Sequence, residues 1–102
     1  VNTIRLLRKI ANTEEYKIIK HQLIKSSTSS GANYEEAQGG SSRADFRNKV
    51  FISLKEMRES NYWMKALKGI NENKEINKEI VELVNESQEL KNILGSIASK
   101  LK

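Results

Sequence analysis

The last third of the chain carries the pattern that most constrains its fold. Apolar or small side chains recur there in alternating steps of four and three residues, at Ile76, Ile80, Leu83, Ser87, Leu90, Leu94, Ile97 and Leu101. Side chains at these steps share one helix face, so the pattern predicts a helix over residues 73–101. Val81, Val84 and Ile93 widen this face beyond the seam of a two-stranded coiled coil. The helix is therefore predicted to pack in a bundle.

The preceding segment carries a second helical pattern. Ser42 and Asp45 match a capping box, in which a hydroxyl begins the helix and an acid follows three residues later. Apolar side chains then recur at helical spacing, at Phe46, Val50, Leu54, Met57, Met64 and Leu67. These features predict a helix over residues 42–69. Ile52, Trp63 and Ala66 lie off this stripe, so the helix is apolar on two sides and one partner is expected to be another subunit.

The segment at residues 13–38 contains two conflicting signals. By composition, the serine- and threonine-rich run at residues 26–31 is typical of a flexible linker. A helical count nevertheless keeps one face in register through this run, at Tyr16, Ile19, Leu23, Ser26, Ser27, Ser30, Tyr34 and Ala37. Helix propensity alone leaves helix and linker evenly balanced. Gly39 and Gly40 are predicted to end the segment.

A shorter helix is predicted over residues 2–11, where Ile4, Leu7 and Ile10 recur. Together the segments predict an all-α fold, an antiparallel up-and-down four-helix bundle with a short first helix, forming one domain over residues 1–102. The absence of proline favours long helices, and the absence of cysteine excludes disulfide scaffolds and thiol chemistry. No apolar run predicts a membrane span or signal, so a cytoplasmic protein without a membrane partner is expected. The chain opens on Val1, which leaves open whether residues precede it.

Enzymatic chemistry finds little support in the sequence. The single histidine, His21, lies on the polar side of its helix and is expected to be solvated. A di-metal bundle needs Glu-x-x-His pairs, which are absent, and no glycine-rich phosphate loop occurs. Glu56 and Glu59, three residues apart among cations, are expected to form ion pairs within the helix or between subunits. We therefore expect no catalytic residue, no metal, no cofactor and no small-molecule substrate.

Charge is distributed unevenly along the chain. Residues 39–70 carry seven basic and three acidic side chains, whereas residues 71–102 carry five and six. The helical count places cations and aromatic rings along one flank of the third helix, a pattern typical of RNA or DNA binding. The candidate nucleic-acid-binding residues are Arg43, Arg47, Lys55, Arg58, Tyr62 and Lys65. In the alternative interpretation, Phe51 and Tyr62 pack against another helix, the cations are only solvated, and the chain is a structural protein–protein interaction module.

Two runs of the sequence resemble a known family. Residues 22–37 (QLIKSSTSSGANYEEA) match its helix pattern Q-L-x-[KR]-S-x-x-S-x-x-x-N-x-x-E-A. Residues 41–46 (SSRADF) and 54–63 (LKEMRESNYW) resemble the helix that follows. The family comprises small bacterial four-helix-bundle proteins encoded in intervening sequences of large-subunit rRNA genes, often labelled ribosomal-protein-like. The accessory protein of diversity-generating retroelements is similar.

The resemblance carries structural and functional implications. It implies that the serine-rich run is helical, that the first helix is short for the family, and that the chain forms a homo-oligomer, typically a pentamer. The expected interface residues are Ile52, Glu56, Glu59 and Trp63. The retroelement relative binds nucleic acid and a reverse transcriptase through its basic surface. For the cations of the third helix this implies binding of RNA, DNA or a nucleic-acid-processing partner; no activity is established for the family. Asn33 is expected to bond a neighbouring helix, and Glu36 to pair with Arg43 or Arg47.

Overall fold

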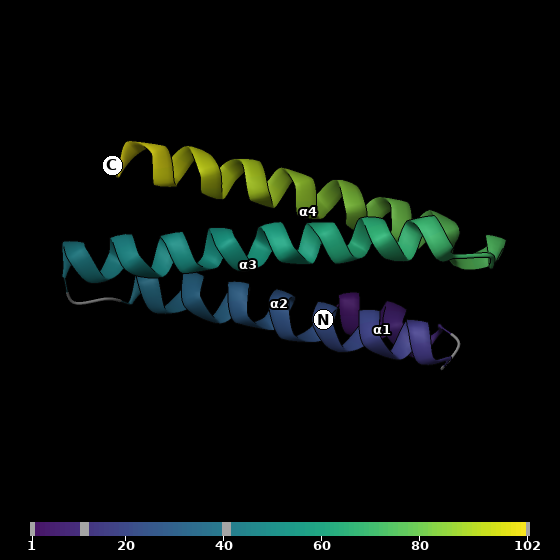
Figure 1. Cartoon of the computed structure of the whole chain (residues 1–102). Helices are drawn as coiled ribbons and strands as arrows, with labels where there is room; N and C mark the ends of the chain where they lie inside the picture. Colours follow the sequence, from purple (N-terminus) through teal and green to yellow (C-terminus); the bar gives the residue numbers. More distant parts are fainter. Residues whose placement is uncertain (1, 11–12, 40–41, 102) are drawn as a thin grey trace.

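The computed structural model describes residues 2–10, 13–39 and 42–101, which form four helices (Figure 1). The helices are α1 (Asn2–Arg8), α2 (Glu14–Gln38), α3 (Arg43–Ile70) and α4 (Lys74–Lys100). The three long helices alternate in direction with α3 in the middle, and α1 packs on α2 and α4 at one end. The molecule measures 45 × 19 × 18 Å. The predicted all-α four-helix bundle with a short first helix is confirmed.

Side-chain caps begin the three long helices. The Thr13 and Ser42 hydroxyl oxygens accept hydrogen bonds from the backbone N–H groups of Tyr16 (3.4 Å) and Asp45 (3.0 Å), and start α2 and α3. The Asn73 side chain accepts from the N–H of Glu75 at 2.9 Å and starts α4. Such caps satisfy amides that have no partner within the helix. Each long helix begins and ends within one residue of its predicted bounds.

The first helix is shorter than predicted. Its α-helical part ends at Arg8, and the N–H groups of Lys9 and Ile10 close tighter turns onto the carbonyls of Leu6 and Leu7. The predicted end of the first helix, at residue 11, lies outside the described residues, and so does Gly40 of the predicted stop. Gly39 caps the end of α2.

The core consists of two apolar clusters at opposite ends of the bundle. The first cluster draws on all four helices, with the buried side chains Leu6, Leu7, Ile10, Ile19, Leu23, Met64, Leu67, Ile76 and Ile80. The second cluster draws on α2, α3 and α4 only, with the buried side chains Ala37, Val50, Leu54, Leu94 and Ala98. Because α1 is short, it contributes to the first cluster and not to the second.

The serine-rich run is helical, and its hydroxyls show how this is possible. Ser26 and Ser27 donate to backbone carbonyls one turn earlier, at 2.8 and 2.7 Å. Ser30 and Ser53 exchange hydrogen bonds between α2 and α3, since each hydroxyl donates to the other residue's carbonyl, at 2.9 and 2.8 Å. Buried hydroxyls thus have partners, and the small side chains let α2 and α3 approach closely.

Polar side chains also lie between α3 and α4, where the sequence pattern indicated Ser87 but not Asn61. Asn61 is buried and donates to the Ser87 hydroxyl at 2.9 Å, and Ser87 donates to the carbonyl of Val84 at 2.9 Å. Ser53 and Ser60 of α3 are buried as well. A count of apolar residues passes over such positions, although their spacing places them on the buried face of α3.

Two predicted side-chain contacts are wrong. Asn33 donates to the carbonyl of Ser29 in its own helix at 2.8 Å, because its half-buried amide lies within reach of the preceding turn. Glu36 pairs with Lys49 at 2.7 Å rather than with Arg43 or Arg47. The contact between Glu36 and Lys49, a hydrogen bond reinforced by the opposite charge, raises the pKa of Lys49 above its ordinary value.

Candidate nucleic-acid interface

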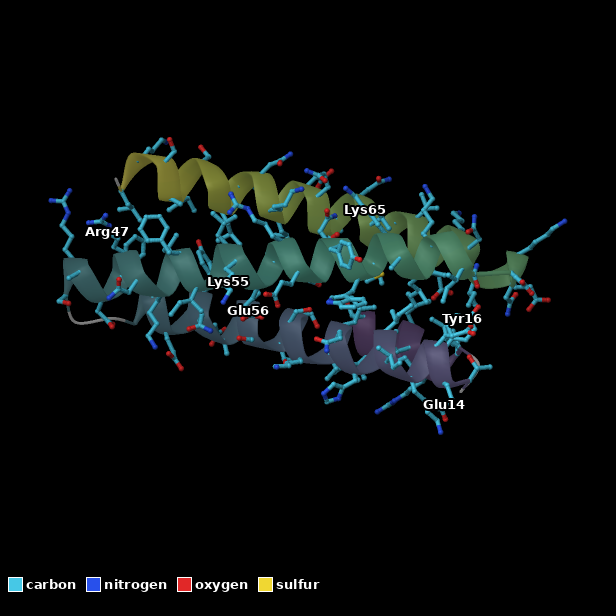
Figure 2. All side chains as sticks on the ribbon, viewed as in Figure 1. Glu14, Tyr16, Arg47, Lys55, Glu56 and Lys65 are labelled. Atoms are coloured by element: carbon cyan, nitrogen blue, oxygen red, sulfur yellow. The ribbon has the colours of Figure 1, made fainter. Side chains whose placement is uncertain are left out.

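The candidate interface is a row of side chains along α3 that we call the basic α3 surface. All six of its residues are exposed to solvent: Arg43, Arg47, Lys55, Arg58, Tyr62 and Lys65. Figure 2 shows Arg47, Lys55 and Lys65 spread along the helix. At about 1.5 Å per residue, the row spans about 33 Å. The structure therefore leaves these predicted residues open to solvent along most of α3.

The cations of this surface form no ion pair among the described residues. The ion pairs among the described residues join Lys9 to Glu79, Lys17 to Glu14 and Lys49 to Glu36, and none involves the basic α3 surface. Lys55, Arg58 and Lys65 accordingly present their charge to solvent. Free cations on one helix face can each neutralise a phosphate and release its counterions.

The two aromatic residues on this flank differ in accessibility. Phe51 is half-buried against the second apolar cluster, and the Arg47 guanidinium lies over its ring, 5.5 Å from the centroid. Tyr62 is 63% exposed and meets the Trp63 ring edge-on, with 5.1 Å between centroids. Packing thus accounts for Phe51, as the alternative interpretation expected, whereas the Tyr62 ring remains accessible for stacking.

One further cation lies at the edge of the surface and was missed from the sequence. Lys91 of α4 is half-buried, and its Nζ lies 3.5 Å from the side-chain oxygen of Asn61 on α3. The spacing of residues within α3 could not reveal a residue that α4 supplies. Only the register between α3 and α4 brings Lys91 to this place.

The residues expected at a subunit interface lie beside the basic α3 surface. Ile52 is 42% exposed, Glu59 is exposed and Glu56 is half-buried. Trp63 is half-buried and packs against the first apolar cluster. A shallow hollow is lined by Gln22, Arg58, Glu59, Tyr62 and Trp63. Candidate interface and candidate nucleic-acid residues therefore meet at this hollow.

Neither a metal-ion cluster nor a membrane-spanning helix occurs among the described residues. Between residues 2 and 101, apart from the undescribed positions, no three His, Asp or Glu side chains gather in a way that could hold a metal ion. In that part of the chain, no helix is both long and apolar enough to span a bilayer. His21 is exposed.

Comparison with known proteins places the chain in a family. The sequence model of the 23S rRNA-intervening sequence protein family matches residues 1–96. The chain is also similar to a protein of unknown function from the S23 ribosomal protein family of Bacteroides thetaiotaomicron, known from a crystal structure. The two are 35% identical, the match covers 94% of this chain and 87% of that one, and the TM-score is 0.75. No curated protein matches the chain. The chain belongs to the 23S rRNA-intervening sequence protein family.

Proposed function

We propose that this protein is a non-catalytic, self-associating four-helix bundle that binds RNA or DNA through the basic α3 surface. The observation that supports the proposal is the row of exposed cations around Tyr62, whose charges meet no acid among the described residues. A polyanion gains most from such a row, because each cation it contacts releases a counterion. An exposed ring within the row adds a platform for an unstacked base.

Self-association is the second part of the proposal. The chain carries a net charge of +5, and copies in a homo-oligomer, a pentamer by family resemblance, would add their fields at a shared surface. Ile52 supports this part, because a large apolar side chain that is 42% exposed at mid-helix gains from burial against a partner.

Nucleic-acid binding is tested with labelled single-stranded RNA and DNA of about 20 nucleotides, followed by fluorescence anisotropy. Affinity should fall steeply with salt, and Arg58→Glu with Lys65→Glu should weaken it by at least about tenfold. The matched control is Lys74→Glu with Lys78→Glu, the same charge change at exposed sites on α4. If neither RNA nor DNA binds at low salt, this part of the proposal is contradicted. The alternative then remains, in which the chain is a structural protein–protein interaction module.

Self-association is tested separately by sedimentation. Ile52→Asp should shift the wild-type oligomer to smaller species, because it places a charge at the expected interface. This variant is cleaner than Trp63→Asp, since Trp63 also packs against the first apolar cluster. The control is Ile93→Asp, at an isoleucine of α4 that is 55% exposed, which should leave the mass unchanged. A monomeric wild type would contradict this part of the proposal.

A further inference from the structure

A buried polar layer holds Lys91 of α4 at the contact between α3 and α4. Asn61 of α3 is 3% exposed, and its side-chain nitrogen donates to the Ser87 hydroxyl at 2.9 Å. Its side-chain oxygen accepts from the Lys91 Nζ at 3.5 Å, and no second donor to this oxygen occurs among the described residues. The Lys91 side chain is half-buried. The Lys91 ammonium is therefore kept at the level of Asn61 instead of extending freely into solvent.

Two exposed cations of α3 lie one turn from Asn61, on either side of it. Arg58 precedes Asn61 by three residues and Lys65 follows it by four, so both lie within about 60° of Asn61 around the helix. Figure 2 shows Lys65 on the side of α3 that faces α4. The Cα atoms of Arg58 and Lys65 are about 10 Å apart along the axis, with the Lys91 ammonium at the level between them. We call Arg58, Lys65 and Lys91 the three-cation cluster.

No acid of α3 or α4 lies on the side of the helix that carries the cluster. Each residue turns an α-helix by about 100°, so every glutamate of α4 lies about 120° or more around that helix from Lys91. Every acid of α3 likewise lies about 140° or more around its helix from Asn61. None of the three cations forms an ion pair among the described residues. Their charge is therefore available to an anion.

The three-cation cluster lies away from α1. Lys9, just after α1, pairs with Glu79 at 2.9 Å, on a side of α4 that is about 120° around the helix from Lys91. The first helix packs on α2 and α4, and within the described residues it makes no close backbone contact with α3. Within the chain, access to the cluster is therefore set by α3 and α4.

The groups in and beside the cluster match the two parts of a nucleotide. Ammonium and guanidinium groups donate short, strong hydrogen bonds to phosphate oxygens. Tyr62 follows Arg58 by four residues and precedes Lys65 by three, and its ring is 63% exposed. A base can stack on such a ring while neighbouring cations contact the backbone phosphates. A single strand offers both parts at once, because its bases are not held in a duplex.

We infer that the three-cation cluster binds the phosphates of a single RNA or DNA strand, with one base stacked on Tyr62, and that Lys91 is the phosphate-binding residue supplied by α4. This assignment rests on the proposed function and extends it, because the binding site is shared between two helices and the basic α3 surface is one part of it. The Asn61 layer places the Lys91 ammonium before the strand arrives, so Lys91 loses less conformational freedom on binding.

The test compares single lysine substitutions in the whole chain, with a labelled single-stranded RNA of about 20 nucleotides followed by fluorescence anisotropy over a range of salt. Lys91→Gln should weaken binding by about threefold or more and make the slope of log affinity against log salt shallower by about 0.7, because one phosphate contact is lost. The matched control is Lys78→Gln, at an exposed lysine about 140° around α4 from Lys91, which should change neither. Lys91→Arg should keep the wild-type slope, because the charge remains.

A second measurement uses the wild-type chain, so it does not depend on how the variants fold. Bound RNA should slow the chemical acetylation of Lys65 and Lys91, read by mass spectrometry, and leave that of Lys78 unchanged. Acetylation of Lys91 at the same rate with and without RNA would overturn the assignment, because the strand would then lie elsewhere.

The outcomes separate this assignment from the proposed function. A shallower slope in Lys91→Gln alone, together with protection of Lys91, supports the assignment. If Lys91→Gln lowers the free energy of unfolding but leaves the slope and the affinity unchanged, Lys91 serves only the fold and the assignment is overturned. The proposed function then still stands, provided that Arg58→Glu with Lys65→Glu weakens binding. A wild-type chain that binds neither RNA nor DNA at low salt would overturn both.

Discussion

The two halves of the bundle differ in how completely the same three long helices are covered. At the end where α1 packs, four helices contribute to one apolar cluster, and Leu23 and Leu67 are fully buried. At the other end, which we call the open half, three helices share a smaller cluster, and Leu90 and Ile93 are 41% and 55% exposed. Among the described residues, α1 contributes side chains to one of the two clusters and not to the other.

The largest expected effect is on the closed half. Leu23→Ala, at a side chain with no exposed area, should lower the free energy of unfolding by about 4 kcal/mol. Leu94→Ala, at a side chain 6% exposed in the smaller cluster, should lower the free energy of unfolding by only about 2 kcal/mol, since its surroundings can relax. Urea unfolding of the two variants measures the difference. Equal losses would indicate that the open half is covered in solution.

The serine pair between the halves should have an intermediate effect. Ser30→Ala and Ser53→Ala should each lower the free energy of unfolding by about 1 kcal/mol, because each removes one hydrogen bond between α2 and α3. The double variant should cost less than the two single variants together, since the bonds are reciprocal. A double-mutant cycle by chemical denaturation measures this coupling. Strict additivity would show that the two hydroxyls act independently.

Replacing a glycine of α2 should raise the stability of the protein rather than lower it. Gly31→Ala should stabilise the protein by about 0.5–1 kcal/mol, because the added methyl meets nothing within 4 Å and alanine favours the helix. Gly95→Ala on α4, which also meets nothing within 4 Å, should stabilise similarly. Thermal unfolding measures both. A loss of stability in either variant would contradict the free space beside these two glycines.

The smallest effect concerns the Glu36–Lys49 pair in the open half. The raised pKa of Lys49 means that the folded chain holds this proton more tightly than the unfolded chain. The contribution of the pair is therefore full at neutral pH and is lost as the pH rises through the raised pKa. Lys49→Met should lower the free energy of unfolding slightly at neutral pH and leave it unchanged well above that pKa. Unfolding measured as a function of pH checks this. Glu36→Gln should show the same trend, and a pH-independent difference would contradict the assignment.

Much of the fold could be predicted from local patterns. Helical spacing and the capping box at Ser42 and Asp45 located the long helices, because these features act within a few residues along the chain. The helical state of residues 26–31 needed the family resemblance, because helix propensity left it undecided. The reciprocal bonds between Ser30 and Ser53 give the physical reason, and they depend on a neighbouring helix.

Contacts between helices were predicted less well. The partner of Glu36 is Lys49, and Asn61 joins a polar layer with Ser87, because the register between helices places these groups together. Exposure of the basic α3 surface followed from helical spacing, but Phe51 proved to be packed under Arg47. The contacts of α1 with α2 and α4 could not be predicted either, since spacing within α1 does not reveal which helices it meets.

The most direct test of the proposed function is the slope of log affinity for single-stranded RNA against log salt. If the basic α3 surface contacts phosphates, the slope should be negative, by about 0.7 for each phosphate contacted. Arg58→Glu with Lys65→Glu should make it shallower by about 1.4, whereas Lys74→Glu with Lys78→Glu should leave it nearly unchanged. A slope that is flat, or that the two double variants change equally, would contradict the account.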